Sequence, residues 1–104
     1  MEQYKISVTD PAEEDLDEIL QYISVQLSAP AAALKLADAF DGAFDDLEDM
    51  PEKYPLVQDD RLAALGYRKR PVKNYLVFFT ADETSHVVYV ERILYARRDW
   101  QNIL

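Results

Sequence analysis

The strand pattern that decides the fold lies in residues 66–100, GYRKRPVKNYLVFFTADETSHVVYVERILYARRDW. Residues 75–80 (YLVFFT) and 87–95 (VVYVERILY) are rich in the β-branched and aromatic side chains that favour strands. The polar residues 81–86 (ADETSH) separate the two runs, which predicts a hairpin with a longish loop. A further strand is predicted from residue 67 to about residue 72, where Pro71 favours an edge position because proline cannot donate to a ladder.

The residues before this meander predict one strand and two helices. Residues 3–9 (QYKISVT) alternate apolar and polar side chains, as a half-buried strand does. A helix is predicted to begin with Asp10 as N-cap and Pro11 in the first turn. Ser28 and Ala29 interrupt it, and Pro30 suits the start of a second helix. The apolar faces are predicted to be Leu16, Ile19, Leu20, Ile23 and Leu27 in the first helix and Ala33, Ala37, Phe40, Phe44 and Leu47 in the second.

The predicted fold class is therefore α+β, with the order β-α-α-β-β-β. A helical hairpin packed on an antiparallel sheet would bury both apolar faces. Residues 56–65 form a connector of undecided structure, and a short helical turn is expected over residues 99–104.

Length and composition restrict the class of protein. The 104 residues are expected to form a single domain, 1–104. The chain has no cysteine, which excludes a disulfide framework and a thiolate site. Its first residues lack the features of a signal peptide, and no apolar run reaches the roughly 18 residues that span a bilayer. We therefore expect a cytoplasmic protein without a membrane segment.

The net charge of −9 is unevenly distributed along the chain. Residues 1–60 hold 16 acidic residues against three lysines, whereas residues 61–104 hold eight basic residues against four acidic ones. The net charge of the whole chain argues against nucleic-acid binding, which needs a positive surface. The acidic residues of the first half can also form an ordinary solvated helical face. The basic half weakens that objection.

Basic and aromatic side chains are the candidate functional residues of the meander. RNA binding uses such a mixture, with arginine on phosphates and aromatic rings on unpaired bases. The cations are Arg68, Lys69, Arg70, Lys73, Arg92, Arg97 and Arg98, and the interleaved rings are Tyr67, Tyr75, Tyr89 and Tyr95. The same residues are also ordinary on a sheet, and Arg98 with Asp99 would suit a structural ion pair. The single histidine, His86, argues against a catalytic triad, and we expect no metal and no cofactor.

The meander also resembles a known family. Residues 67–69 (YRK), 74–78 (NYLVF) and 92–100 (RILYARRDW) resemble the RelE/ParE superfamily of bacterial toxins from type II toxin–antitoxin pairs. The upstream strand and helices fit the same fold, so the resemblance covers nearly the whole chain. It implies a cognate antitoxin as partner, a toxin–antitoxin hetero-oligomer, and growth arrest through DNA gyrase or ribosome-dependent cleavage of mRNA.

The two branches of this superfamily imply different site residues. In RelE-like nucleases, basic residues on the first meander strand and an arginine after the last strand contribute to cleavage, which corresponds to Arg68, Arg70 and Arg97 here. Lys69, Lys73 and Arg98 would then contact RNA or another target, and Tyr95 is a weaker proton-transfer candidate because an unperturbed tyrosine pKa lies near roughly 10.

Two expected nuclease positions are empty in this sequence. Leu76 follows Tyr75 where the nucleases carry an arginine, and the chain ends WQNIL without their C-terminal tyrosine or histidine. These departures are typical of the ParE-like branch, whose members poison gyrase. A third possibility is a non-catalytic family member that acts as a protein-binding or regulatory module.

Overall fold

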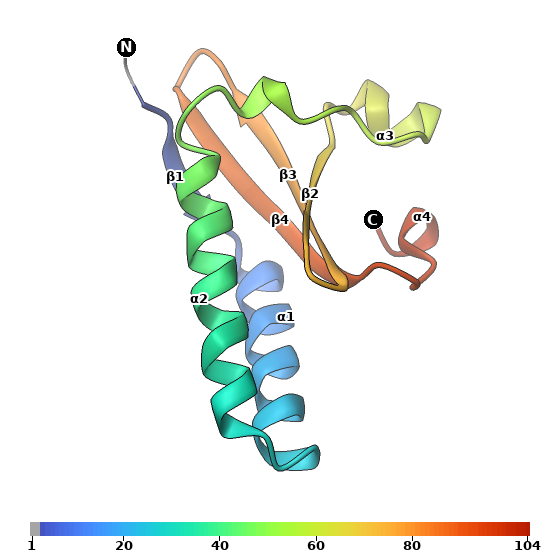
Figure 1. Cartoon of the computed structure of the whole chain (residues 1–104). Coiled ribbons are helices and arrows are strands. Elements are labelled where there is room, and N and C mark those ends of the chain that lie inside the picture. The colour runs from blue at the N-terminus through green and yellow to red at the C-terminus, as the bar shows by residue number, and fades with distance from the viewer. Residues whose placement is uncertain (1–2) are drawn as a thin grey trace.

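The computed structural model describes residues 3–104 and confirms the predicted α+β order. In chain order the elements are β1 (Lys5–Val8), α1 (Asp10–Gln21), a π-helical turn η1 (Tyr22–Gln26), α2 (Pro30–Asp46), a 3-10 turn η2 (Pro51–Lys53), α3 (Asp60–Ala64), β2 (Arg68–Val72), β3 (Tyr75–Asp82), β4 (Val87–Tyr95) and α4 (Trp100–Ile103). The helices α1 and α2 lie side by side along the sheet, and the short α3 and α4 lie together near one end of it (Figure 1).

The four strands form one sheet in the order β1-β4-β3-β2. The meander β2–β3–β4 is antiparallel, as predicted, and Pro71 lies in the edge strand β2. The strand β1 differs from the prediction because it pairs in parallel with β4. The helical hairpin explains this direction, since it returns the chain to the start of β1, where the Tyr4 N–H donates to the Glu48 carbonyl at 2.8 Å.

The main core lies between the sheet and the two long helices. It contains Leu36 and Phe40 of α2 and the C-cap residue Leu47, together with Val77, Phe79, Val88, Val90 and Ile93 of the strands. The predicted faces of the helices hold in part: Ala37 and Phe44 are only half-buried, and Leu27 is 55% exposed. The π-helical turn that precedes Leu27 adds a residue to the helical repeat and so rotates the following side chain away from the sheet.

A second cluster covers part of the opposite face of the sheet, and we call it the outer cluster. It consists of Val57, Leu62, Leu76, Phe78, Leu94 and Trp100. The connector whose structure the sequence left undecided contributes Val57 and the five-residue helix α3, and the predicted C-terminal turn contributes Trp100 as the first residue of α4. The ring centroids of Trp100 and Phe78 are 5.3 Å apart, so α4 is held against the sheet.

The start of α1 occupies the edge of β4 where β1 ends. Thr9, rather than the predicted Asp10, is the N-cap, because its hydroxyl accepts from the Ala12 N–H at 3.3 Å. The same hydroxyl donates to the Glu91 carbonyl of β4 at 3.1 Å. One threonine therefore begins the helix and continues the hydrogen bonding of the sheet edge.

Exposed carboxylates along α2 lead to a prediction about salt. Asp38, Asp41 and Asp45 are exposed at helical spacing on α2, and the exposed Asp49 lies in the bend after the helix, which ends earlier than predicted. None of the four forms an ion pair within residues 3–104. Like charges at such spacing repel, and those near the helix C-terminus also oppose its dipole. We expect the melting temperature to rise between low and moderate sodium chloride, and to rise less in an Asp41→Asn/Asp45→Asn variant. A melting temperature that falls over this range would contradict the prediction.

Candidate functional site

The arginines of β2 point towards the helices and are held by internal partners. Arg68 and Arg70 lie opposite Phe79 and Val77 of the main core. The Arg68 guanidinium donates to the Tyr54 carbonyl at 2.7 Å, and Arg70 forms an ion pair with Asp46 of α2 at 2.6 Å. This hydrogen bond to Asp46 raises the pKa of Arg70, against the opposing effect of burial. Both guanidinium groups are therefore part of the contact between β2 and the preceding chain.

Arg92 of β4 is held in the same way by α1. Its guanidinium donates to both carboxylate oxygens of Asp15, with Nε–Oδ2 and Nη2–Oδ1 distances of 2.6 and 2.9 Å. The Ile93 N–H donates to the same carboxylate at 3.0 Å. The hydrogen bond to Asp15 raises the pKa of Arg92 despite partial burial. Asp15 therefore closes the part of the β4 edge that β1 does not reach.

The remaining cations lie away from these arginines. Lys69 points to the outer face, where its Nζ lies 5.6 Å from the centroid of the Trp100 ring. Lys73, in the turn between β2 and β3, and Arg97 and Arg98, after β4, are exposed. The two segments meet through a hydrogen bond from the Ala96 N–H to the carbonyl of the residue after Lys73, at 2.8 Å. We call these three residues the basic corner.

The structure thus divides the predicted nuclease residues between two places. Arg68 and Arg70 lie on the helix-facing side of β2, whereas Arg97 lies in the basic corner beyond the end of β4. Tyr95 packs edge-on against Tyr75, with ring centroids 5.8 Å apart. The suggested pair of Arg98 with Asp99 is not formed among the described residues, since the Asp99 carboxylate accepts instead from the Asn102 side chain at 2.6 Å.

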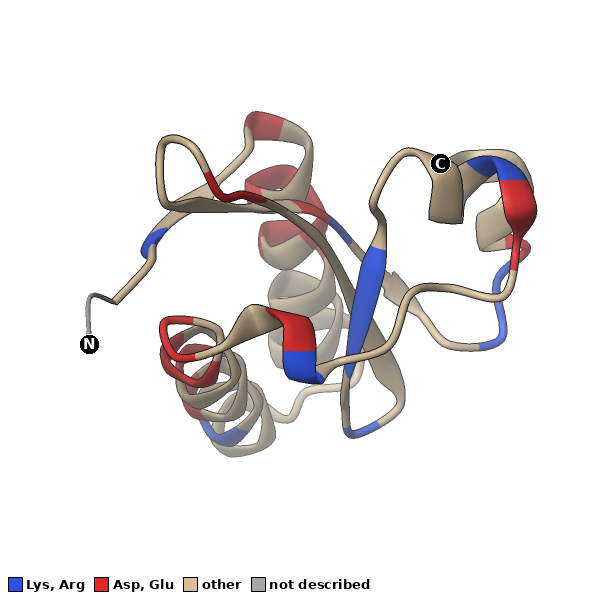
Figure 2. Ribbon diagram, turned by 90° about the horizontal axis from the view of Figure 1, so that it is seen from above, with Lys and Arg blue, Asp and Glu red and all other residues tan. Residues whose placement is uncertain are grey.

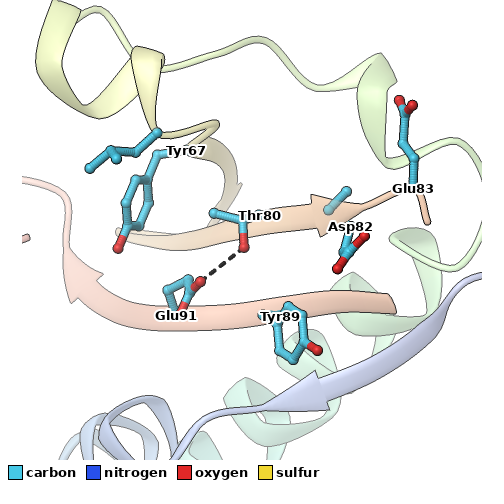
Figure 3. A pocket seen from close by; sticks show the side chains of 8 residues that line it. Tyr67, Thr80, Asp82, Glu83, Tyr89 and Glu91 are labelled. Atoms are coloured by element: carbon cyan, nitrogen blue, oxygen red, sulfur yellow. Dashed lines mark hydrogen bonds between the residues drawn. The ribbon is translucent and has the colours of Figure 1, made fainter. Parts of the chain in front are cut away.

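The open part of the outer sheet face forms a recess that the sequence analysis did not single out. The recess has a volume of about 700 Å³ and is lined by Leu65, Tyr67, Thr80, Ala81, Asp82, Glu83, Tyr89 and Glu91. Figure 3 shows Thr80 and Glu91 between Tyr67 at one end and Tyr89 and Asp82 towards the other. We call it the acidic recess.

The strand register explains why polar side chains gather there. Thr80 of β3 lies opposite Tyr89 of β4. It is on the same face of β3 as Phe78 and Leu76, which come two and four residues earlier. The register shifts between residues 78 and 79, where Glu91 is the extra residue of β4. Such a bulge re-aims a side chain. The available sequence signal was the change from apolar to polar residues along one face of β3.

The carboxylates of the recess give it a negative charge, which the nearby charges of Arg61 and Arg92 offset in part. The Glu91 carboxylate accepts from the Thr80 hydroxyl at 2.9 Å, but neither Glu91, Asp82 nor Glu83 forms an ion pair within residues 3–104. Burial and, next, the charge of Glu91 raise the pKa of Tyr67, whereas the charges of Arg61 and Arg92 lower it. Such a surface suits a cation and repels a phosphate.

Figure 2 shows how charged residues are distributed over the described chain: basic residues (blue) follow β2, and acidic residues (red) gather on the helices. Among residues 3–104, no group of three or more potential ligand side chains is arranged to hold a metal ion. In the same residues, no helix combines the length and apolar character needed to cross a membrane.

The fold is shared with chains from solved structures of toxin–antitoxin systems. The chromosomal ParDE system from P. aeruginosa contains a chain that is 19% identical, with a TM-score of 0.73, over 90% of this chain and 97% of that one. The RelBE2 complex from Mycobacterium tuberculosis contains one that is 18% identical, with a TM-score of 0.64, over 89% of this chain and 98% of that one. No protein of curated function matches the sequence significantly.

The sequence itself identifies the family. The model for the ParE toxin of the parDE type II toxin–antitoxin system matches residues 6–100. The chain therefore belongs to the ParE toxin family and is the toxin component of a type II toxin–antitoxin module. This confirms the superfamily that the meander resembles.

Proposed function

We propose that this toxin arrests growth by binding a protein target, DNA gyrase, and not by cleaving mRNA. In this proposal a cognate antitoxin holds the toxin inactive in a hetero-oligomer in the cytoplasm. The observation that carries the proposal is the charge of the sheet. Its strand arginines have internal partners, and its open outer face is the acidic recess.

A phosphate would meet unfavourable electrostatics on this face. RNA cleavage needs a cation that stabilises the charge developing on the scissile phosphate. Arg70 and Arg92 would have to leave Asp46 and Asp15 to supply it. The loss would be up to roughly 1 kcal/mol for the pair with Asp46, whose side chain is 46% exposed, and larger for Asp15, which would keep only the hydrogen bond from the Ile93 N–H. On the open part of the outer face, RNA would approach the carboxylate of Glu91.

The two positions at which the sequence departs from the nucleases have structural roles here. Leu76 and Trp100 are 8% and 9% exposed, and both belong to the outer cluster. An arginine at residue 76 would place a charge in that cluster. These residues support a toxin in which packing has taken the place of nuclease chemistry.

The proposal is tested by mapping RNA 5′ ends in bacteria and by measuring the supercoiling activity of gyrase. We expect brief induction of the protein in bacteria to arrest growth without producing new RNA 5′ ends. Purified toxin should inhibit DNA supercoiling by purified gyrase, and co-expression of the adjacent antitoxin gene should restore growth. New ends clustered within codons of translated messages would overturn the gyrase assignment.

One observation favours the nuclease as a second candidate. Arg97 is exposed in the basic corner and has no internal ion pair within residues 3–104. If the protein cleaves mRNA, we expect Arg97→Ala to abolish both growth arrest and the new 5′ ends, while its circular dichroism spectrum and melting temperature stay those of the wild type. A folded Arg97→Ala protein that still cleaves would contradict this role. Harmless expression of a folded wild-type protein would instead favour the non-catalytic binding module.

The expected antitoxin contact is also electrostatic. The exposed carboxylates of α2 suit a basic antitoxin segment, while an acidic segment would suit the basic corner. Both similar structures are of toxin–antitoxin systems, which supports a cognate antitoxin for this chain. We expect an antitoxin segment that folds as it binds.

A further inference from the structure

The geometry points to the acidic recess as the place where the toxin receives an arginine side chain from a basic segment of its target protein. This inference rests on the proposed function, because it specifies how a protein target is recognised. It assigns Glu91 as the group that pairs with the guanidinium and Tyr67 as the ring against which the guanidinium lies.

The recess offers the two kinds of contact that arginine uses. A guanidinium pairs with carboxylates through parallel N–H donors and stacks on aromatic faces. The Glu91 carboxylate accepts one hydrogen bond from the Thr80 hydroxyl, at 2.9 Å, and a carboxylate can accept roughly four. Tyr67, just before β2, and Tyr89 of β4 supply aromatic rings.

The carboxylates of the recess are open to a cation from outside the described chain, although Arg61 and Arg92 already lower the pKa of Tyr67 by their charge. The basic residues of this part of the molecule are occupied elsewhere: the guanidinium groups of Arg61, Arg68 and Arg92 donate to the C-terminal segment, to the Tyr54 carbonyl and to Asp15. The carboxylates that line the recess have no ion pair within residues 3–104. A basic partner side chain would therefore gain an attraction without breaking an existing pair.

Other ligands fit less well. The acidic side chains of the recess do not form one of the three-residue groups that would hold a metal ion, within the described residues. Asp82 is turned to its own loop, where it accepts from the Thr84 and Ser85 N–H groups at 2.9 and 3.2 Å. The remaining combination of Glu91 with two tyrosine rings matches a cationic side chain of a polypeptide.

The position of the recess favours the target over the antitoxin as the source of this segment. Most of the recess is formed by β3, β4 and the residue before β2, which the sheet holds in place, while Leu65 follows α3 and Glu83 lies in the turn after β3. Its shape therefore exists in the free toxin, which is the state that acts on a target. The exposed carboxylates of α2 are not among the residues that line the recess, so they remain available to the antitoxin.

The test compares Glu91→Gln and Tyr67→Leu with the matched control Glu14→Gln, an exposed change on α1. Glutamine keeps the size of the side chain and an acceptor for Thr80, so the melting temperature should stay close to that of the wild type. We expect both recess variants to weaken binding of the full-length toxin to purified gyrase by about tenfold or more, and to relieve growth arrest. Glu14→Gln should behave as wild type.

A second measurement uses N-acetyl-argininamide as a probe of the recess. Its titration into the purified toxin should shift the ring resonances of Tyr67 and Tyr89, and Glu91→Gln should remove these shifts. Absence of the shifts in the wild-type protein would overturn the inference, whatever the cellular target.

The outcomes separate this inference from the proposed function. If the wild type inhibits gyrase and folded Glu91→Gln inhibits it equally, the recess assignment fails while the function stands. If the wild type arrests growth without binding gyrase, the gyrase assignment fails, and the effect of Glu91→Gln on growth then decides the recess. If Glu91→Gln keeps gyrase inhibition but escapes the antitoxin, the segment belongs to the antitoxin and the target assignment is overturned.

Discussion

Replacement of Asp15 with alanine is expected to lower the free energy of unfolding by about 3 kcal/mol, because it leaves a partly buried guanidinium without its partner. The Asp15 side chain is only 12% exposed and accepts three hydrogen bonds, two from Arg92 and one from the Ile93 N–H. Removing it breaks the connection between α1 and the unpaired edge of β4. In a domain of this size, the melting temperature should fall by roughly 10–20 °C.

Urea denaturation followed by circular dichroism measures this loss, with Asp17→Ala as the control. Asp17 is an exposed residue of the same helix, so its replacement should change the free energy of unfolding by less than about 0.5 kcal/mol. Asp15→Asn should fall between the two, since it keeps an acceptor but loses the charge. Equal stability of Asp15→Ala and Asp17→Ala would show that the pair with Arg92 contributes nothing.

Replacement of Trp100 with alanine is expected to cost about 3 kcal/mol through the cavity that it leaves in the outer cluster. Trp100 is 9% exposed, packs on Phe78 and has the Lys69 ammonium 5.6 Å from its ring centroid. It is the buried residue of α4, a helix of one turn that depends on this contact. In the Trp100→Ala variant, we therefore expect α4 to detach before the rest of the protein unfolds.

Limited proteolysis together with urea denaturation tests this expectation. Trp100→Ala should be cleaved near residues 97–104 far faster than the wild type, whereas the neighbouring exposed change Gln101→Ala should not. Trp100→Phe should recover most of the stability, because a ring still fills the space beside Phe78. Wild-type resistance to protease in Trp100→Ala would mean that α4 is held by other contacts, such as those of Arg61 with the Gln101 and Leu104 carbonyls.

Most of the fold could be predicted because its elements have strong local signals. The runs 75–80 and 87–95 and the apolar faces of the two long helices indicate strands and helices directly. The sequence gives weaker signals where a feature depends on the tertiary structure. The helix α3 has five residues with one buried side chain, Leu62, which is too short for a periodic pattern. The N-cap is Thr9 and not the predicted Asp10, because the Thr9 hydroxyl also contacts β4.

The candidate site was less predictable, because the sequence shows which residues are charged but not which charges meet. Asp46 and Asp15 are 24 and 77 residues from Arg70 and Arg92, and only the packing of the helices on the sheet brings them together. The basic segment of the sequence therefore becomes a sheet with an acidic open face. Glu91 reaches that face through the bulge in β4, a feature that residue patterns alone do not reveal.

The position of β4 beside β1 also has a consequence for how the toxin is made. Lys5 of the first strand pairs with Val87, so a ribosome must synthesise nearly the whole chain before the two can meet. The main core and the outer cluster both contain side chains of β4. The earlier segments therefore cannot form a stable arrangement by themselves. Contacts between residues so distant in the chain slow folding. A cell that stops translation of this message early should therefore release only unfolded, harmless fragments.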